Sequence, residues 1–471
     1  MATDREVGAG GKDARDGRGG KERRLPPGPR APAAWQSLQW VLRPVPFMEA
    51  CRRRFGDTFT LKLGPLADVV FLTEPESIKA AYLAPPEVAH AGDINGLFRP
   101  ILGSHSLLLL DGDEHIRQRK LMLPPFHGTR IERWGQVMRE VAEADVADWP
   151  FNRPFGLEEH MQRITLRVIL RTVFGVEDGP RLERLRRLVN RQLELSRSYS
   201  TMLPQLRHEL GGRSPWGKLM QCIRDVDEAL YAEIGRRRHA ADLADRDDVL
   251  SLLLLARDED GAGMTDVEVR DQLLTLLVSG HETSATQLAW TFERLLRHPE
   301  ALARVHAEVE AGEHEFTDAA IRESMRLRPV LPISARKLTG PYAIGDWRFP
   351  RGTVLMCCAY LANRNPDVYP DPEAFRPERF LADEVPPYAW IPFGGGVRRC
   401  LGASFASFEM RVVLQTLLSR ATLRPASPRA ERVMRRSFTF APDRDCRVVL
   451  EERRRPPGLA ARAQRATHAV P

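Results

Sequence analysis

The sequence predicts a mostly α-helical protein that carries small antiparallel β-sheets. Apolar residues recur at intervals of three and four through the middle of the chain, which is the period of helices with one buried face. Segments with strand-like composition are short and gather near the two ends. No low-complexity linker divides the 471 residues, so we expect one large domain or two intimately packed ones.

The two ends of the chain differ in composition from this body. Residues 1–24 are charged and glycine-rich, and they contain no apolar run long enough for a signal peptide or a membrane span. A proline-rich lead-in follows them. We therefore predict a disordered basic, glycine- and proline-rich tail over 1–34, a folded domain over 35–451, and a flexible tail over 452–471.

Each part of the folded body is assigned by its own pattern. The helical period holds in seven segments, which are 130–175, 181–210, 216–257, 266–297, 300–311, 317–327 and 402–419. Short apolar and aromatic runs predict strands at FTLKLG (59–64) and DVVFLT (68–73), and then within 343–360 and 438–450. We expect these strands to form small antiparallel sheets that draw on both ends of the chain.

Charge and cysteine content exclude several classes of function. The formal net charge is +7 and the isoelectric point is about 9.2, a modest excess for this length. We find no basic clusters interleaved with aromatic residues, so no nucleic-acid partner is expected, whereas an acidic protein partner fits the charge. The six cysteines are scattered without a CxxC pair, which argues against a disulfide framework or a structural zinc site and favours a reducing, cytoplasmic compartment.

One cysteine stands in an unusual setting, FGGGVRRCLG (393–402). Three consecutive glycines suit a turn whose backbone approaches another group closely. Arg398 and Arg399 place positive charge beside Cys400, so we expect them to lower the pKa of its thiol and favour the thiolate. A thiolate is either a nucleophile or a metal ligand, and this stretch alone leaves both open.

The segment 266–297 predicts a long helix whose centre is apolar nearly all round. Glu282 lies in that centre, next to Thr283 and shortly after Gly280. A buried carboxylate must be paired or functional, and a glycine within a helix is unfavourable unless another group approaches the backbone there. The alternative is a polar kink whose hydrogen bonds are satisfied within the helix.

Two further patterns are ambiguous when each is taken alone. Glu323 and Arg326 are three apart on a helix and can pair, and Arg379 in the irregular segment 363–380 could join them in a buried ionic triad. His115 and Arg119 are neighbours on one helix face and repel each other unless an anion lies between them. A solvent-exposed salt bridge and a solvated basic face are the alternatives.

Together these segments resemble the cytochrome P450 family of haem-thiolate monooxygenases, in its soluble bacterial form. The ligand-loop pattern of that family, FGxGxRxCxG, is met at every fixed position by 393–402. The oxygen-activation motif AGxET corresponds to SGHET, with Ser279 in place of alanine, and ESMR and FRPERF supply the ExxR and PERF elements. The resemblance covers about 55–450, and the ligand loop is its most specific part.

The resemblance implies a cytochrome P450 fold, a triangular-prism haem domain, and a role for each matching residue. Cys400 would bind the iron of haem b as a thiolate, within the ligand loop formed by Phe393, Gly394 and Gly402. The haem propionates would be held by Arg398, His115, Arg119 and Arg336. Gly280 would let the helix approach the haem, Glu282 and Thr283 would relay protons toward dioxygen with the Ser279 hydroxyl nearby, and Glu323, Arg326 and Arg379 would fix the proximal loop.

The implied reaction is insertion of one oxygen atom from dioxygen into an apolar substrate. A haem-thiolate protein that does not activate dioxygen, such as a peroxygenase, an isomerase-type relative or a gas-binding protein, is the alternative. Relatives that dispense with dioxygen often lack the acid–alcohol pair, and this chain has it in Glu282 and Thr283. The pair favours the monooxygenase.

The resemblance also implies separate electron donors. No flavin or nicotinamide domain follows the ligand loop, so no bound flavin is expected and a ferredoxin with its reductase is the expected source. We expect docking on a basic face near Arg117, Lys120 and Arg399, and a monomeric protein without a membrane span.

The substrate pocket in this family is built from four segments that are apolar in this chain. They contain Leu97, Phe98, Ile101, Leu276, Leu331, Ile333 and Phe438. Arg99 is the only nearby cation in these segments. The expected substrate is therefore lipophilic: a fatty acid, terpenoid, steroid or polyketide.

Overall fold

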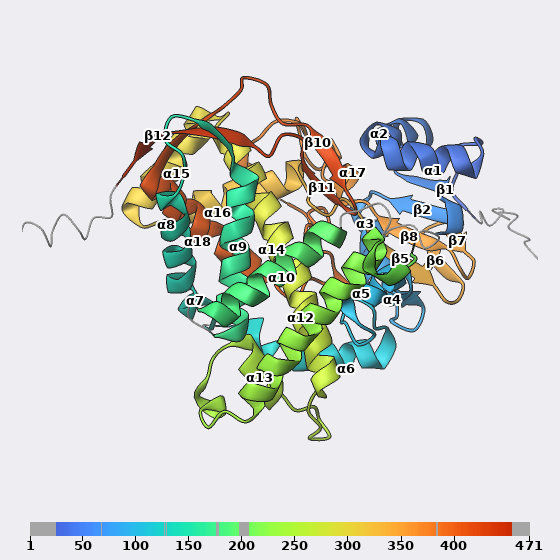
Figure 1. Ribbon diagram of the computed structural model, residues 1–471. Helices are drawn as coiled ribbons and strands as arrows, with labels where there is room; N and C mark the ends of the chain where they lie inside the picture. Colours follow the sequence, from blue (N-terminus) through green and yellow to red (C-terminus); the bar gives the residue numbers. More distant parts are fainter. Residues whose placement is uncertain are drawn as a thin grey trace, which may run out of the picture.

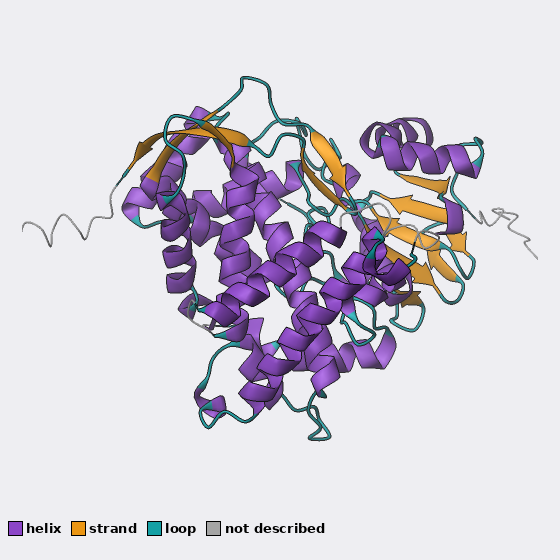
Figure 2. Cartoon of the chain, viewed as in Figure 1, coloured by secondary structure: helices purple, strands orange, loops and turns teal. Residues whose placement is uncertain are grey.

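The computed structural model describes residues 25–66, 68–126, 128, 130–175, 179–196, 207–382 and 385–454. Helices make up most of this part, and small sheets lie at its edges (Figure 2), which confirms the predicted fold class. Most of the two predicted tails, residues 1–24 and 455–471, lies outside the described residues.

The bounds of the helices follow. The α-helices are α1 (Ala33–Leu42), α2 (Pro44–Phe55), α3 (Pro75–Tyr82), α4 (Gly92–Asn95), α5 (Arg99–Leu102), α6 (Gly112–Met122), α7 (Arg130–Arg133), α8 (Gly135–Ala147), α9 (Leu157–Phe174), α10 (Pro180–Ser196), α12 (Pro215–Arg238), α13 (Val249–Leu255), α14 (Asp266–Leu295), α15 (Pro299–Ala311), α16 (Glu315–Leu327), α17 (Ala359–Ala362) and α18 (Ala403–Arg420). The predicted segments 300–311, 317–327 and 402–419 agree with α15, α16 and α18 to within two residues.

The predicted helical segments 130–175 and 216–257 are each interrupted. Strand β4 (Pro154–Gly156) separates α8 from α9, because Pro150 and Pro154 supply no backbone N–H for a continuous helix. A polar stretch ends α12, and α13 begins at Asp248, whose carboxylate accepts a hydrogen bond from the Ser251 N–H at 3.0 Å. The end of the predicted segment 181–210 includes 197–206, which lie outside the described residues.

The main sheet unites distant parts of the chain. Its strands are β1 (Thr58–Lys62), β2 (Asp68–Leu72), β8 (Val354–Cys357), β5 (Ser334–Leu338) and β3 (Ala89–His90), in that order across the sheet. The pairing of β2 with β8 is parallel, with Val69 opposite Val354, so the prediction of purely antiparallel sheets was wrong here. The two strands come from segments nearly three hundred residues apart, which leaves their relative direction free of any hairpin constraint.

The smaller sheets are antiparallel, as predicted. Strand β12 (Arg447–Arg453) lies between β4 and β9 (Ala421–Pro425), β10 (Val433–Arg436) pairs with β11 (Thr439–Pro442), and β6 (Tyr342–Ile344) pairs with β7 (Trp347–Phe349). Figure 1 shows the main sheet beside α1 and α2, and the helical body on its other side.

Helix α14 runs through the middle of the helical body (Figure 1). Thr265 begins it with a capping box, in which the Thr265 hydroxyl accepts from the Glu268 N–H and the Glu268 carboxylate accepts from the Thr265 N–H. The side chains of 22 of its 30 residues are buried, as a helix that is apolar nearly all round requires. The helix packs against α9, α16 and α18.

Candidate functional site

The loop before Cys400 depends on its glycines. Gly394 and Gly396 have φ angles of 67° and 63°, in the left-handed region. A Cβ on Gly396 would lie 2.1 Å from the Tyr82 carbonyl oxygen, and one on Gly395 would lie 2.5 Å from the Tyr82 ring. Tyr82 ends α3, so the loop is shaped by direct contact with an early part of the chain, and a side chain at either glycine would displace it.

Cys400 differs from the other five cysteines, which are all buried, because its side chain is accessible. Its N–H donates to the Phe393 carbonyl oxygen at 2.8 Å, and the Phe393 ring meets the Trp390 ring edge-on at 6.1 Å. The Gly402 N–H bonds to the sulfur, and this bond lowers the thiol pKa, as the charges of Arg119 and Arg399 also do.

The predicted net lowering of the Cys400 pKa is nevertheless wrong for the protein alone. Protein atoms packed around the thiol partly desolvate it although the residue remains exposed, and this desolvation outweighs the three lowering influences, so the pKa is raised. Arg398 lies beside Cys400 in sequence, but its guanidinium binds Asp111 instead. A thiol in this setting becomes a thiolate when it binds a cation.

Four basic side chains converge from three elements on the region near Cys400. His115 and Arg119 come from α6, Arg336 from β5, and Arg398 from the short 3-10 helix η8 (Gly396–Arg398). His115 and Arg336 are buried, and the other two are half-buried. Burial, and then the charges of the three arginines, lower the pKa of His115 to about 3, so this imidazole is neutral.

This cationic cluster has too few carboxylates to balance it. Arg398 donates to the Leu107 carbonyl oxygen at 3.3 Å, to the Leu110 carbonyl oxygen and to the carboxylate of Asp111. Asp111 is the one carboxylate paired with the three arginines among the described residues, which leaves a net charge of +2. Burial lowers the pKa of Arg398 to about 10, against the opposing effect of Asp111. The cluster therefore suits a ligand that carries two negative charges.

The centre of α14 shows the predicted polar interruption. The Thr283 hydroxyl donates to the Ser279 carbonyl oxygen at 2.8 Å, and the Ser279 hydroxyl donates to the Thr275 carbonyl oxygen at 2.6 Å. From α9, the Thr165 hydroxyl donates to the His281 carbonyl oxygen at 3.0 Å. These hydroxyls satisfy backbone oxygens of a helix that is continuous here, so the hydrogen bonds agree with the alternative raised from the sequence, whereas the kink that it included is not seen.

The neighbour of Gly280 in the structure is a side chain of α9, whereas its predicted role concerns a haem. A Cβ at this position would lie 3.0 Å from the Cδ1 of Ile169 in α9. The side of the backbone that a side chain would occupy therefore faces a helix–helix contact. Close packing of α14 on α9 is the physical reason for glycine here, and its approach to a haem stays a prediction.

A buried ion pair that the sequence analysis missed adjoins Glu282. Arg436 in β10 donates to both carboxylate oxygens of Glu158, at 2.5 and 3.0 Å, and the Thr286 hydroxyl donates to the same carboxylate at 3.0 Å. Burial alone would lower the pKa of Arg436, but Glu158 and the nearby charge of Glu282 raise it. The Glu158 carboxylate of α9 is thus bonded to both α14 and β10, and no local sequence pattern marks this contact.

The ionic triad predicted from ExxR and PERF forms. Glu323 and Arg326 are fully buried and joined by two hydrogen bonds of 2.7 and 2.8 Å, and the Nε of Arg379 lies 3.4 Å from Glu323. Arg326 also donates to the carbonyl oxygens of Asn363, Pro372 and Ala374, at 2.7 to 3.0 Å. The triad therefore holds the irregular segment 363–380, and a solvent-exposed salt bridge is excluded.

The predicted pocket residues come together only in part. The Phe98 and Phe438 rings meet edge-on at 5.2 Å, and Phe98 and Ile101 share an apolar cluster with Val278 of α14. The other predicted residues are placed differently: Leu276 lies in the main core, Ile333 packs against the sheet, Leu97 is half-buried, and Leu331 is exposed.

Val278, rather than Leu276, therefore packs with Phe98 and Ile101. Arg99 is also not the only cation nearby, because Arg207 donates to the Leu97 carbonyl oxygen at 3.2 Å and stacks on Trp216.

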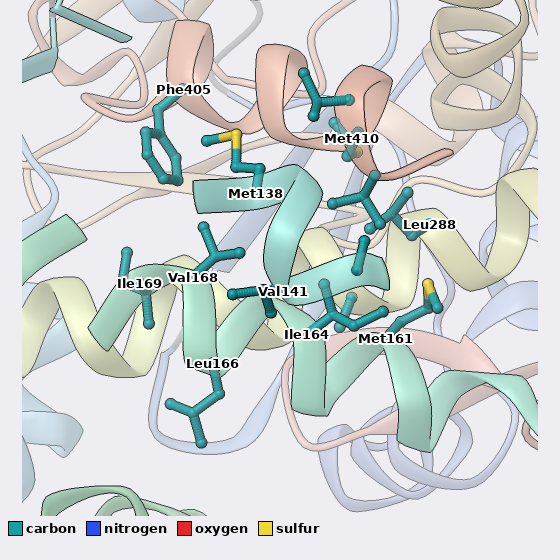
Figure 3. Close-up of a cluster of buried hydrophobic side chains, with 14 of the residues drawn as sticks. Met138, Val141, Met161, Ile164, Leu166, Val168, Ile169, Leu288, Phe405 and Met410 are labelled. Atoms are coloured by element: carbon teal, nitrogen blue, oxygen red, sulfur yellow. The ribbon is translucent and has the colours of Figure 1, made fainter. Parts of the chain in front are cut away.

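Glu409 is a second buried acidic residue that the sequence analysis missed. It lies on α18, is 1% exposed, and neither carboxyl oxygen has a hydrogen-bond partner of normal geometry. Burial raises its pKa to about 8, and only the nearby Ser284 hydroxyl opposes this. Figure 3 shows the apolar cluster beside it, in which Met410 of α18 faces Leu288 of α14.

The predicted basic docking face is partly neutralised. Arg117 donates to Asp258 at 2.7 Å and to Glu268 at 3.0 Å, and Lys120 donates to Glu259 at 2.7 Å. Arg399 is exposed and forms no ion pair within the described residues. The acidic turn before α14 therefore masks two of the three predicted cations.

Comparison with known proteins places these features in a family. A family model described as cytochrome P450 matches residues 26–444. The chain is 40% identical over 430 residues to cytochrome P450 135B1 of Mycobacterium tuberculosis, covering 90% of this chain and 91% of that protein. It is 39% identical over 431 residues to cytochrome P450 138 of Mycobacterium bovis, covering 91% of this chain and 97% of that protein.

Solved structures show the same fold at lower identity. A cyanobacterial CYP120A1 with retinoic acid bound matches with a TM-score of 0.80 and 24% identity, over 91% of this chain and 99% of that one. The haem domain of cytochrome P450DA matches with a TM-score of 0.79 and 23% identity, over 91% and 98%. Within the part of the chain that the structure describes, no helix is long and apolar enough to cross a membrane.

Proposed function

Since the chain belongs to the cytochrome P450 family, whose members are in general haem-thiolate monooxygenases, we propose that it inserts one oxygen atom from dioxygen into a lipophilic small molecule. The observation that carries the proposal is the position of Cys400. It is the one accessible thiol of six, and it lies in a glycine-shaped loop beside a cationic cluster with a net charge of +2. A fatty acid, terpenoid, steroid or polyketide fits the apolar side chains around Phe98 and Phe438.

The residues present fit haem b. Haem b would supply an iron centre that binds and activates dioxygen, with the Cys400 thiolate as its protein ligand. Its two propionates would match the charge of the cluster of Arg119, Arg336 and Arg398. His115 would then lie beside carboxylates, which would raise its pKa from about 3 toward the ordinary range and let it donate a second hydrogen bond.

The centre of α14 would deliver protons. The proton on Oγ1 of Thr283 forms a hydrogen bond with the Ser279 carbonyl oxygen. A short rotation of the Thr283 side chain would turn this hydroxyl away from the backbone and into the pocket. Glu282 is half-buried and can exchange protons with solvent. The guanidinium of Arg436 lies near Glu282 and places a positive charge close to this side chain.

We further propose that electrons come from a ferredoxin and its reductase, docked on the face that exposes Arg399. The pairing of Arg117 and Lys120 with acidic residues confines that face to the surroundings of the ligand loop. An acidic partner steered there would associate more slowly at high ionic strength.

A haem-thiolate protein that does not activate dioxygen is the alternative function. The hydroxyl of Thr283 and the carboxylate of Glu282, both on the accessible stretch of an otherwise buried helix, favour the monooxygenase. Both functions would use the Cys400 ligand loop. They differ in whether α14 delivers protons for the activation of dioxygen.

The absorption spectrum of the reduced, carbon-monoxide-bound protein tests the thiolate, and incorporation of labelled dioxygen into product tests the reaction. We expect a strongly red-shifted Soret band that Cys400→Ala abolishes and that Cys222→Ala, at a buried cysteine, retains. A folded, haem-loaded protein without that band would refute the thiolate assignment. Product formed with peroxide alone and never with dioxygen would establish the alternative.

A further inference from the structure

Helix α1 exposes an apolar face that the proposed reaction does not use. Its ten residues carry no charged side chain. Trp35, Leu38 and Leu42 follow the helical spacing i, i+3, i+7 and are 48%, 50% and 67% exposed, and Val41 beside them is 49% exposed. Single exposed apolar residues are ordinary, but four on one short uncharged helix form a patch that marks an interaction surface.

The helix is held firmly with this face outward. Gln36 on its opposite side is fully buried, donates to the Pro29 and Ala31 carbonyl oxygens at 3.2 and 2.7 Å, and accepts from the Lys62 N–H at 3.0 Å. Trp40 packs edge-on against Phe71 at 5.6 Å. The apolar face is therefore presented by a fixed helix.

The patch continues toward the predicted pocket. Arg435 in β10 donates to the Trp40 carbonyl oxygen at 2.9 Å and lies over the Trp40 ring. The β10–β11 hairpin then exposes Met434 and Phe438, at 44% and 47%, and Phe438 meets Phe98 of the pocket. Figure 1 shows β10 and β11 between α14 and the α1–α2 pair.

The charges around the patch identify its occupant. Between Leu25 and Met48 the chain has two arginines, Arg30 and Arg43, and no carboxylate. The preceding residues 1–24 add seven basic and five acidic side chains, but they contain only Met1 and Val7 as large apolar residues. That segment therefore cannot cover the patch with apolar surface. A second copy would bring the same positive charges against each other.

We propose that the face formed by Trp35, Leu38, Val41 and Leu42 binds the surface of an anionic lipid bilayer. An uncharged apolar helix face bordered by arginines enters the boundary between headgroups and acyl chains and lies in the plane of the membrane. No membrane-spanning helix is needed. Lipophilic substrate could then pass from the bilayer to the mouth at Phe438, a consequence that rests on the proposed function, whereas the binding itself does not.

Flotation of the full-length, haem-loaded protein with lipid vesicles tests this. We expect it to float with vesicles of equal parts phosphatidylcholine and phosphatidylglycerol, and much less with phosphatidylcholine alone. The triple change Trp35→Ser, Leu38→Ser and Leu42→Ser should reduce the bound fraction roughly tenfold or more, because it removes most of the apolar surface that would enter the bilayer. A matched control, Phe151→Ser with Val267→Ser, alters exposed apolar residues elsewhere and should float like the wild type.

Three outcomes would overturn the proposal that this face binds lipid. Absence of flotation with both vesicle types would refute a lipid occupant, as would equal loss in the control variant. A dimer in light scattering that the triple change dissolves would assign the face to a second copy. The carbon-monoxide spectrum, recorded on every variant, reports the proposed function separately: flotation without a thiolate band would refute that function and leave the lipid site standing.

Discussion

Glu409 gives a quantitative test of the electrostatics of the core. Its carboxyl is buried on α18 without a hydrogen-bond partner of normal geometry, and burial raises its pKa from 4.5 to about 8. Between these two values the folded protein keeps a proton that the unfolded chain releases. The free energy of unfolding therefore falls as the pH rises through this window, and the loss is complete above about pH 8.

The magnitude follows from the size of the pKa change. One pKa unit corresponds to about 1.4 kcal/mol, so this single group should lower the free energy of unfolding by about 3–4 kcal/mol between pH 5 and pH 8. Glu409→Gln keeps the shape of the side chain and removes the proton equilibrium. The variant should therefore gain stability relative to the wild type as the pH rises.

The assay is urea denaturation of the haem-loaded wild type and variant across this pH range. The difference in their free energies of unfolding should grow by about 3–4 kcal/mol from pH 5 to pH 8. A control at an exposed glutamate, Glu132→Gln, should show no comparable growth. A constant difference between Glu409→Gln and the wild type would refute the reasoning, because it would mean that Glu409 ionises equally in both states.

Two further predictions concern the site. Thr283→Ala should retain haem and the carbon-monoxide spectrum but divert electrons to hydrogen peroxide, lowering product per electron with little change in substrate affinity. Changing Ser279 to alanine as well removes a second hydroxyl, and a double variant that stays fully coupled would exclude proton delivery by α14. Glu323→Gln leaves Arg326 buried without its counter-charge and should cost about 3–5 kcal/mol of stability. It should be seen as earlier thermal unfolding and haem loss, while Glu373→Gln, at an exposed ion pair, should change neither.

Local spacing determined how much of this protein could be predicted from its sequence. The Cys400 loop and the Glu323–Arg326 pair depend on residues a few positions apart, and both were found from the sequence. Glu158 and Arg436 are 278 positions apart in the chain, so no local pattern could pair them. In the sequence, Glu409 looks like an ordinary polar residue of an amphipathic helix. Its burial on all sides is produced by the neighbouring helices, which a local pattern does not reveal.

The errors have similar causes. The segment 130–175 was predicted as one helix because its apolar period continues across Pro150 and Pro154, whereas the backbone hydrogen bonds do not. The segment 216–257 was predicted as one helix across the polar stretch that ends α12. Leu276 was assigned to the pocket from its place in the motif. The packing of α14 against its neighbours decides which of its side chains lies near Phe98, and in the structure that side chain is Val278.

The contact between Tyr82 and the glycines before Cys400 has a consequence for how the protein matures. The two partners are more than three hundred positions apart, and Tyr82 lies so close to Gly395 and Gly396 that the final shape of the loop is fitted against it. During synthesis, nearly the whole chain must therefore be made before the loop can contact Tyr82. The long search for this contact makes completion of the ligand loop a late step of folding, so a newly made chain would acquire its cofactor only after translation has passed the loop.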